Sequence, residues 1–185
     1  MIVEIRTLKE SELAAFWQVA YANPNAEWVK WNGPYFHDTL PKKSEFLGEI
    51  GKKWADDPFH KVIIINGKIV GSVGAYFADG RLKRWLEVGI IIYAENNWGK
   101  HIGREALAQW ITYLFKATNL PHIGFTTWSG NERMMHVGQA LGMQLEGRIR
   151  KVRYWNNQYF DSIKYGVLRD EWLELQLKEE QSDDN

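Results

Sequence analysis

The chain has 185 residues, no cysteine, and 23 lysine and arginine residues that balance 23 aspartate and glutamate residues. This length suits one domain, the lack of cysteine excludes disulfides and thiolate catalysis, and the even charge argues against nucleic acid or an anionic membrane as a partner. No apolar run approaches the ~20 residues of a membrane span, so we expect a cytoplasmic protein with one domain over residues 1–176 and a polar, frayed tail over 177–185.

The expected elements follow from the apolar pattern, which alternates in strands and recurs every three or four residues in helices. Asn66-Gly67 and Asn156-Asn157 indicate two hairpin turns. The elements are a strand at 2–6, helices at 12–22 and 42–56, a hairpin at 61–77, a strand at 85–94, a helix at 100–118, a strand at 122–128, a helix at 131–143 and a hairpin at 147–168. This order predicts an α/β (mixed α+β) sheet of about seven strands flanked by about four helices, with a helix crossover at 100–118.

The stretch ENNWGKHIGREAL, residues 95–107, links an expected strand to an expected helix. The first turn of a helix has unpaired N–H groups and a positive dipole end, which together bind anions. Gly99 and Gly103 leave the backbone accessible, and Lys100, His101 and Arg104 add positive charge. The stretch matches neither the P-loop nor the dinucleotide fingerprint. An anion site and a plain glycine turn with solvated charges both remain open on these residues.

Three segments together resemble the GNAT acyltransferase superfamily. EVGIIIYAENNWGKHIGREAL is similar to its cofactor motif, a strand followed by [Q/R]xxGx[G/A] opening a helix that grips the pyrophosphate of acetyl-CoA. SGNERMMHVGQALGM and RYWNNQYFDSIKYGVLRDEW are similar to later segments of the branch that contains ribosomal-protein N-terminal acetyltransferases and many small-molecule acetyltransferases. The resemblance covers residues 62–172 well and the first 60 weakly.

The resemblance implies a twisted mixed sheet and an N-acetyltransferase that moves an acetyl group from acetyl-CoA to a primary amine. The acceptor amine is a protein N-terminus or a small molecule, the attack is direct in a ternary complex, no metal takes part, and a homodimer is left open. The implied cofactor-binding residues are Ile90, Ile91, Ile92, Trp98, Gly99, Lys100, His101, Ile102, Gly103, Arg104 and Asn131.

Some positions depart from the family pattern. His101 stands at the first glycine of the motif, and Trp98 at its Gln or Arg. Gly138 occupies the position of a tyrosine that many members use as general acid, and Met134 that of a serine found in some relatives. These departures leave an alternative open, namely a catalytically weak or inactive CoA-binding module of the same fold.

Glu87 is the expected general base. It lies in the apolar strand WLEVGIII and, with a period of two, shares a face with Gly89 and Ile91. The carboxylate would then lie about 7 Å from Gly89, within reach of the acceptor amine through one water. The alternative is an exposed glutamate paired with Arg84 or Lys83.

Other polar and aromatic residues give weaker signals. Asn131 caps a helix in one interpretation and binds the cofactor arm in the other. Trp31, Tyr35 and Trp155 are the expected substrate-binding aromatics, and the alternative, which is the more common place for such residues, is the core. Ser129 and His136 are minor alternatives for acid or base. The histidines are dispersed without metal-ligand spacing, so no metal site is expected.

Overall fold

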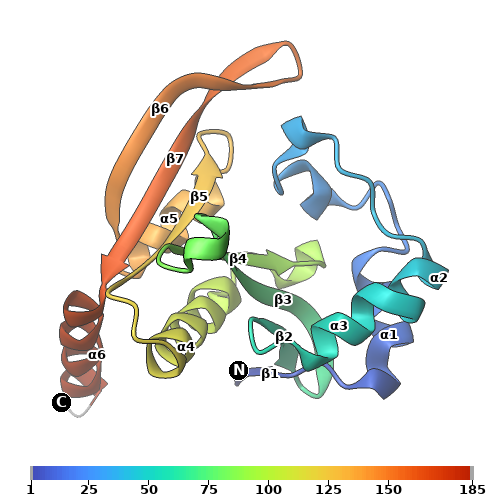
Figure 1. Ribbon diagram of the computed structural model, residues 1–185, viewed down its shortest axis with the longest axis horizontal. Coiled ribbons are helices and arrows are strands. Elements are labelled where there is room, and N and C mark those ends of the chain that lie inside the picture. Colours follow the sequence, from blue (N-terminus) through green and yellow to red (C-terminus); the bar gives the residue numbers. More distant parts are fainter. Residues whose placement is uncertain (1, 184–185) are drawn as a thin grey trace. The chain divides into compact units, whose positions relative to one another are not determined.

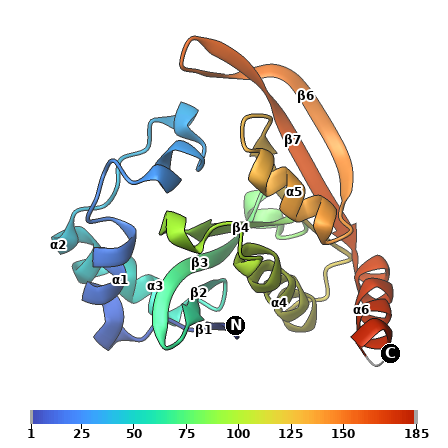
Figure 2. The same cartoon turned by 180° about the vertical axis from the view of Figure 1, so that it is seen from behind.

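The computed structural model describes residues 2–183 (Figures 1 and 2). Its strands are β1 (Val3–Arg6), β2 (His60–Ile65), β3 (Lys68–Phe77), β4 (Leu86–Ile92), β5 (His122–Trp128), β6 (Gln144–Trp155) and β7 (Gln158–Leu168). Its helices are α1 (Leu13–Ala20), α2 (Lys43–Glu45), α3 (Gly51–Asp56), α4 (Ile102–Ala117), α5 (Glu132–Ala140) and α6 (Arg169–Asp183), with a π-helical turn at Phe46–Ile50 that joins α2 to α3. The predicted mixed α/β class with seven strands is confirmed, and α6 is the helix that the sequence did not predict.

The chain forms two compact units, described separately below. The first comprises the residues up to Ala75 together with Gly89–Gln109, and the second comprises Tyr76–Val88 together with the residues from Trp110 onward. Strands β3 and β4 and helix α4 each contribute residues to both units. Within the residues described, no helix is long and apolar enough to span a membrane, and no group of three or more acidic or histidine side chains could hold a metal ion.

The first unit orders its strands β1-β2-β3-β4, and its β1/β2 and β2/β3 pairs are antiparallel. Beyond the end of β4, the Tyr93 N–H donates to the Val70 carbonyl of β3 at 3.0 Å. An added Cβ on Gly71 would collide with the Ile91 carbonyl oxygen. A glycine is therefore required where the backbone of β3 passes the end of β4.

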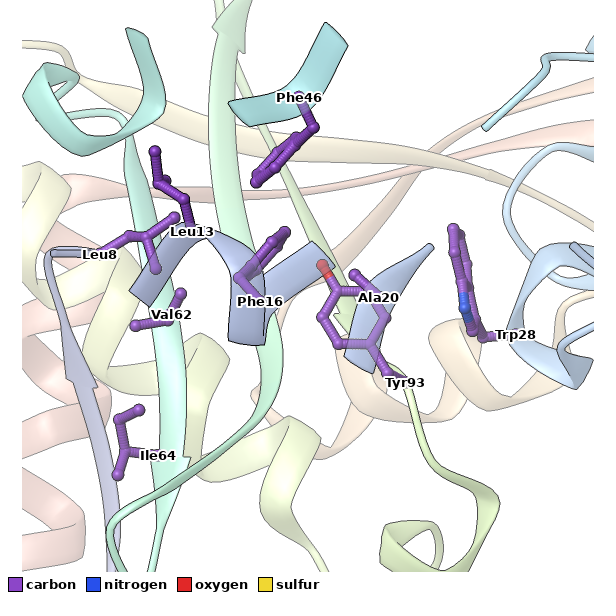
Figure 3. Close-up of a cluster of buried hydrophobic side chains, with 9 residues drawn as sticks. All are labelled: Leu8, Leu13, Phe16, Ala20, Trp28, Phe46, Val62, Ile64 and Tyr93. Carbon is purple, nitrogen blue, oxygen red and sulfur yellow. The ribbon is translucent and has the colours of Figure 1, made fainter. Parts of the chain in front are cut away.

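An aromatic core holds the first unit together (Figure 3). Leu13, Phe16 and Ala20 recur at helical spacing, so α1 turns one apolar face inward. The Phe16 ring stacks on Phe46 at 5.3 Å and meets Tyr93 edge-on at 5.7 Å. The buried members of the cluster are Leu8, Leu13, Phe16, Ala20, Trp28, Phe46, Val62, Ile64 and Tyr93.

A short chain of hydroxyl groups crosses this core. The Tyr93 hydroxyl lies 2.7 Å from Ser72 Oγ and is also hydrogen-bonded to Tyr21. Burial raises the pKa of both tyrosine hydroxyls. These groups therefore stay neutral at ordinary pH, and their role is to satisfy one another inside an apolar core.

The second unit orders its strands β4-β5-β7-β6. β4 and β5 are parallel, as expected for strands joined by a helix crossover, while β5/β7 and β6/β7 are antiparallel. Figure 1 shows the β6–β7 hairpin continuing well beyond the end of β5. At that point β6 bulges between Ile149 and Arg153. Asp161 of β7 holds the bulge by accepting from Arg148 Nε at 2.6 Å and from the Lys151 N–H at 2.9 Å.

Helix α6 is held by side chains that reach back to α4. The Arg169 guanidinium donates to the carbonyls of Phe115, Thr118 and Leu120, where α4 ends. Trp172 is buried, and its Nε1 donates to Thr112 Oγ1 at 3.0 Å. Arginine thus satisfies the unpaired carbonyls of a helix C-terminus.

Candidate functional site

The predicted cofactor turn lies in the first unit and is tied to the end of β4. Ile90, Ile91 and Ile92 form the last residues of that strand and are half-buried. After a 3-10 turn at Glu95–Asn97, the Trp98 indole N–H donates to the Ile92 carbonyl at 2.9 Å. The tryptophan that replaces the family's Gln or Arg therefore fastens the turn to the strand.

Two residues of this turn have a left-handed backbone, Gly99 with φ 71° and His101 with φ 61°. Glycine adopts this conformation without strain, whereas other residues pay roughly 1–2 kcal/mol, and histidine is among those found there more often. The geometry explains why the family pattern has a glycine at the position of His101. In this chain the backbone conformation is kept although the residue differs.

Helix α4 begins directly after His101, because the Glu105 N–H donates to the His101 carbonyl at 3.0 Å. Its first N–H groups have no acceptor within the helix and lie at the positive end of its dipole. An added Cβ on Gly103 would have only Ile90 Cδ1 within reach, at 4.0 Å, and nothing lies within 4 Å of one on Gly99. Lys100 and Arg104 are exposed. Open space, backbone donors and two cations fit a pyrophosphate.

Glu87 lies in the second unit at the centre of a polar cluster. Its side chain is 4% exposed. Its carboxylate accepts hydrogen bonds from Tyr76 Oη at 2.8 Å, from Thr126 Oγ1 at 2.7 and 2.9 Å, and from Lys164 Nζ at 3.1 Å. The exposed glutamate paired with Arg84 or Lys83, considered above, is therefore wrong. A buried carboxylate is held here by one cation and two hydroxyls.

The partners of Glu87 come from three strands that are distant in the sequence. Tyr76 lies in β3, whereas Thr126 of β5 and Lys164 of β7 stand opposite each other in the register. Lys164 Nζ also donates to Thr126 Oγ1 at 2.7 Å and lies 4.9 Å from the Trp85 ring centroid. Sequence reasoning missed all three partners. The one available signal was Lys164, a charge between apolar and aromatic residues in the strand segment 163–168.

Helix α5 and the residues just before it offer no acid at the positions used in the family. Gly138 is buried, and an added Cβ would clash with the Phe125 ring, so a tyrosine cannot be accommodated there. Ser129 Oγ accepts from the Asp161 N–H at 2.9 Å and thereby braces β7. The Asn131 side chain accepts from the Met134 N–H at 3.1 Å, which makes it the N-cap of α5.

The expected substrate aromatics fall in separate places. Trp31 follows the 3-10 turn Glu27–Lys30 and Tyr35 lies in the turn Pro34–Phe36, both in the first unit. Trp155 ends β6, and its ring meets Trp128 edge-on at 5.7 Å. Its register partner Gln158 lies roughly 20 Å along β7 from Lys164, so Trp155 is remote from Glu87 along the hairpin.

Comparison with solved structures defines the class of fold. The structure of spermidine N-acetyltransferase from Vibrio cholerae in complex with CoA and spermine matches with a TM-score of 0.73 and 22% identity, over 92% of this chain and 98% of that one. An acetyltransferase of the GNAT family from Bacillus anthracis matches with a TM-score of 0.71 and 19% identity, over 92% and 97% of the two chains. The fold is thus that of this class of acetyltransferases.

Sequence comparison identifies the family. The model of the acetyltransferase (GNAT) domain matches residues 3–144, so the chain belongs to the GNAT acetyltransferase family. The protein named "Putative ribosomal N-acetyltransferase YdaF" from Bacillus subtilis (strain 168) is 29% identical over 110 residues, which span 60% of this chain and 59% of that protein. The uncharacterized N-acetyltransferase YoaA of the same organism is 26% identical over 102 residues, 55% of this chain and 56% of that protein. The matched region is thus less than two thirds of each relative.

Proposed function

We propose that this protein is an N-acetyltransferase that moves the acetyl group of acetyl-CoA to a primary amine within a ternary complex. The observation that carries the proposal is the turn at 98–104, where a left-handed backbone, the start of α4 and two exposed cations coincide. Membership of the GNAT family and the predicted motif order support the same function.

Each part of the proposed site has a separate task. Residues 98–104 bind the pyrophosphate through the first N–H groups of α4, and Lys100 and Arg104 add charge. The backbone of Ile90, Ile91 and Ile92 orients the arm of the cofactor, and the Asn131 side chain assists while capping α5. When bound, acetyl-CoA supplies the activated thioester. Glu87 takes the proton that the acceptor ammonium must lose before attack.

The acceptor class is a primary amine, on a protein N-terminus or on a small molecule. The printed names of relatives include a ribosomal acetyltransferase and a spermidine acetyltransferase, which support both kinds. Trp31 and Tyr35 are proposed to contact the acceptor, because aromatic faces attract ammonium groups. Trp155, which is remote from Glu87 along the hairpin, is proposed to contact a more distant part of the acceptor. The balanced charge of the chain disfavours nucleic acid as a partner. We propose a cytoplasmic location and leave a homodimer as an open arrangement.

A catalytically weak or inactive CoA-binding module is the second candidate. It is favoured by His101 in place of a glycine and by Gly138, which has no room for the usual tyrosine acid. Turnover of acetyl-CoA against a panel of amines separates the two. Activity well above the rate without protein supports the enzyme, whereas CoA binding without turnover supports the module.

The cofactor site is tested by Gly103→Glu. A glutamate in the first turn of a helix is compatible with folding, but its carboxylate would occupy the proposed pyrophosphate site and repel it. We expect calorimetry to show no CoA binding. Gly48→Glu is the matched control, because it adds the same charge at an exposed helical glycine with nothing within 4 Å. A folded Gly103→Glu variant with unchanged CoA affinity would remove the site from residues 98–104.

A further inference from the structure

Glu87 is enclosed by its hydrogen-bond donors. With 4% of its side chain exposed, the carboxylate has little direct access to an acceptor amine in solution. One oxygen accepts from Lys164 and Thr126, and the other accepts from Tyr76 and Thr126. A proton that reaches Glu87 must therefore arrive through one of these three neighbours.

Tyr76 is the most exposed of the three. It is 56% exposed, while its hydroxyl donates to Glu87 Oε2 at 2.8 Å. Thr126 is half-buried, and its hydroxyl bridges both oxygens of Glu87 and accepts from Lys164. Lys164 carries three N–H donors and has no lone pair while it is charged. Tyr76 alone combines an exposed body with a hydroxyl that can accept a proton on one side and donate one on the other.

We propose that Tyr76 relays the proton of the acceptor ammonium to Glu87. This inference rests on the acetyltransferase function proposed above and adds a residue to its mechanism. The ammonium N–H bond breaks as a new O–H bond forms on Tyr76, while the original phenolic proton passes to Glu87 Oε2. The amine becomes neutral, Tyr76 remains a phenol, and Glu87 becomes a carboxylic acid. The reverse transfer to water restores the starting state.

Lys164 and Thr126 act as positioning residues in this scheme. Lys164 Nζ engages Oε1 of Glu87, so the proton from Tyr76 reaches the opposite oxygen, Oε2. Thr126 Oγ1 links the lysine to the carboxylate, and the Trp85 ring covers the lysine ammonium. This arrangement keeps the acceptor oxygen of Glu87 aimed at Tyr76.

Other candidate proton-transfer groups in the described part of the second unit do not contact Glu87. Gly138 has no space for a side chain, and Ser129 is engaged with the backbone of β7. The exposed tyrosines of the hairpin, Tyr154 and Tyr159, pack against each other at 4.8 Å, near the turn. Within the second unit, Tyr76 is the tyrosine whose hydroxyl contacts the buried carboxylate.

The test is Tyr76→Phe, with Tyr159→Phe as the matched control because it removes the same hydroxyl from an exposed hairpin residue. We expect kcat at neutral pH to fall by about 10- to 100-fold, a loss within the range typical of proton-transfer groups. The acetyl-CoA dissociation constant, measured by calorimetry, and the melting temperature should stay close to wild type. The kcat loss should shrink at high pH, where the amine is already neutral, and the solvent isotope effect on kcat should change.

A double variant distinguishes a relay from two independent effects. Groups that act as one unit lose activity non-additively, so Tyr76→Phe should cost little more in the Glu87→Gln background. Full multiplication of the two losses, or Tyr76→Phe with kcat within about twofold of wild type, overturns the relay. If the wild-type protein acetylates no amine, the proposed function fails and the relay with it. If the wild type is active and Tyr76→Phe is unaffected, only the relay fails.

Discussion

The turn at 98–104 in the first unit and the Glu87 cluster in the second unit are built in different ways. The turn relies on backbone, namely the left-handed conformations of Gly99 and His101 and the start of α4. The cluster relies on side chains that four strands bring together around one carboxylate. One part suits binding of an anion, and the other suits movement of a proton.

This difference predicts how the two parts respond to substitution. A backbone site tolerates a new side chain when the conformation is kept, and His101 in a glycine position is an example. A side-chain cluster does not tolerate a change of charge, because each buried group depends on its partners. The hydroxyl chain of Tyr21, Tyr93 and Ser72 gives a contrast, since its groups are buried but neutral.

The largest effect is expected for Glu87→Gln. The change keeps the shape of the side chain and removes its basicity, so kcat at neutral pH should fall by about 10²- to 10⁴-fold. CoA affinity should change little, because the pyrophosphate is proposed to bind to the backbone of the turn. Steady-state kinetics and calorimetry measure the two quantities.

Glu49→Gln serves as the control, because Glu49 is an exposed glutamate paired with Lys53. A Glu87→Gln protein with normal kcat would return Glu87 to a structural role. Loss of CoA binding would contradict the separation of the two parts.

An intermediate effect is expected for Gly71→Ala. The added methyl group would push against the Ile91 carbonyl oxygen, where β3 passes the end of β4. Overpacking of this kind typically costs about 1–3 kcal/mol of unfolding free energy. Denaturant titration should detect the loss, and CoA affinity should weaken with it because Ile91 belongs to the proposed cofactor groove.

Gly48→Ala is the matched control, since nothing lies within 4 Å of an added Cβ at that helical position. It should leave stability unchanged or slightly raised. If Gly71→Ala and wild type have the same free energy of unfolding, β3 and β4 can move apart at this point without loss of stability.

The smallest effect is expected for His101→Gly. Glycine relieves the left-handed strain at φ 61°, which favours folding, but it has more freedom in the unfolded chain, which disfavours folding. The two effects on the free energy of unfolding largely offset each other, so the turn should keep its conformation. CoA affinity should change by no more than about tenfold, or ~1.4 kcal/mol. A gain of a thousandfold in calorimetry would show that the histidine impairs the pocket and would favour the inactive module.

Local sequence patterns sufficed for most elements of the fold. The two hairpins, the strand His122–Trp128 and the helix after the turn follow from turn residues and apolar spacing. Helix α6 could not be predicted in this way, because its start is fixed by Arg169 binding carbonyls at the end of α4. A tertiary partner some 50 residues distant leaves no local pattern.

The two parts of the proposed site also differ in whether a local sequence pattern predicts them. The turn has a contiguous signature, so Trp98 to Arg104 could be identified from a short motif. Glu87 was identified as an unusual charge in an apolar strand, but its partners depend on the register of β5 against β7. Which side chain stands opposite Thr126 is set by the pairing of whole strands, which no single segment encodes.

The bulge in β6 lies where the hairpin loses the support of β5. The pairing of β5 with β7 ends at Trp128 and Ser162, and beyond it the hairpin is a two-stranded ribbon. Asp161 stands at this exit, where the Lys151 N–H and then Arg148 lower the pKa of its carboxyl group. The carboxylate therefore keeps its bonds to Arg148 and to the Lys151 N–H at all but strongly acidic pH, and this single residue holds the bulge from which the two-stranded ribbon and its aromatic end continue.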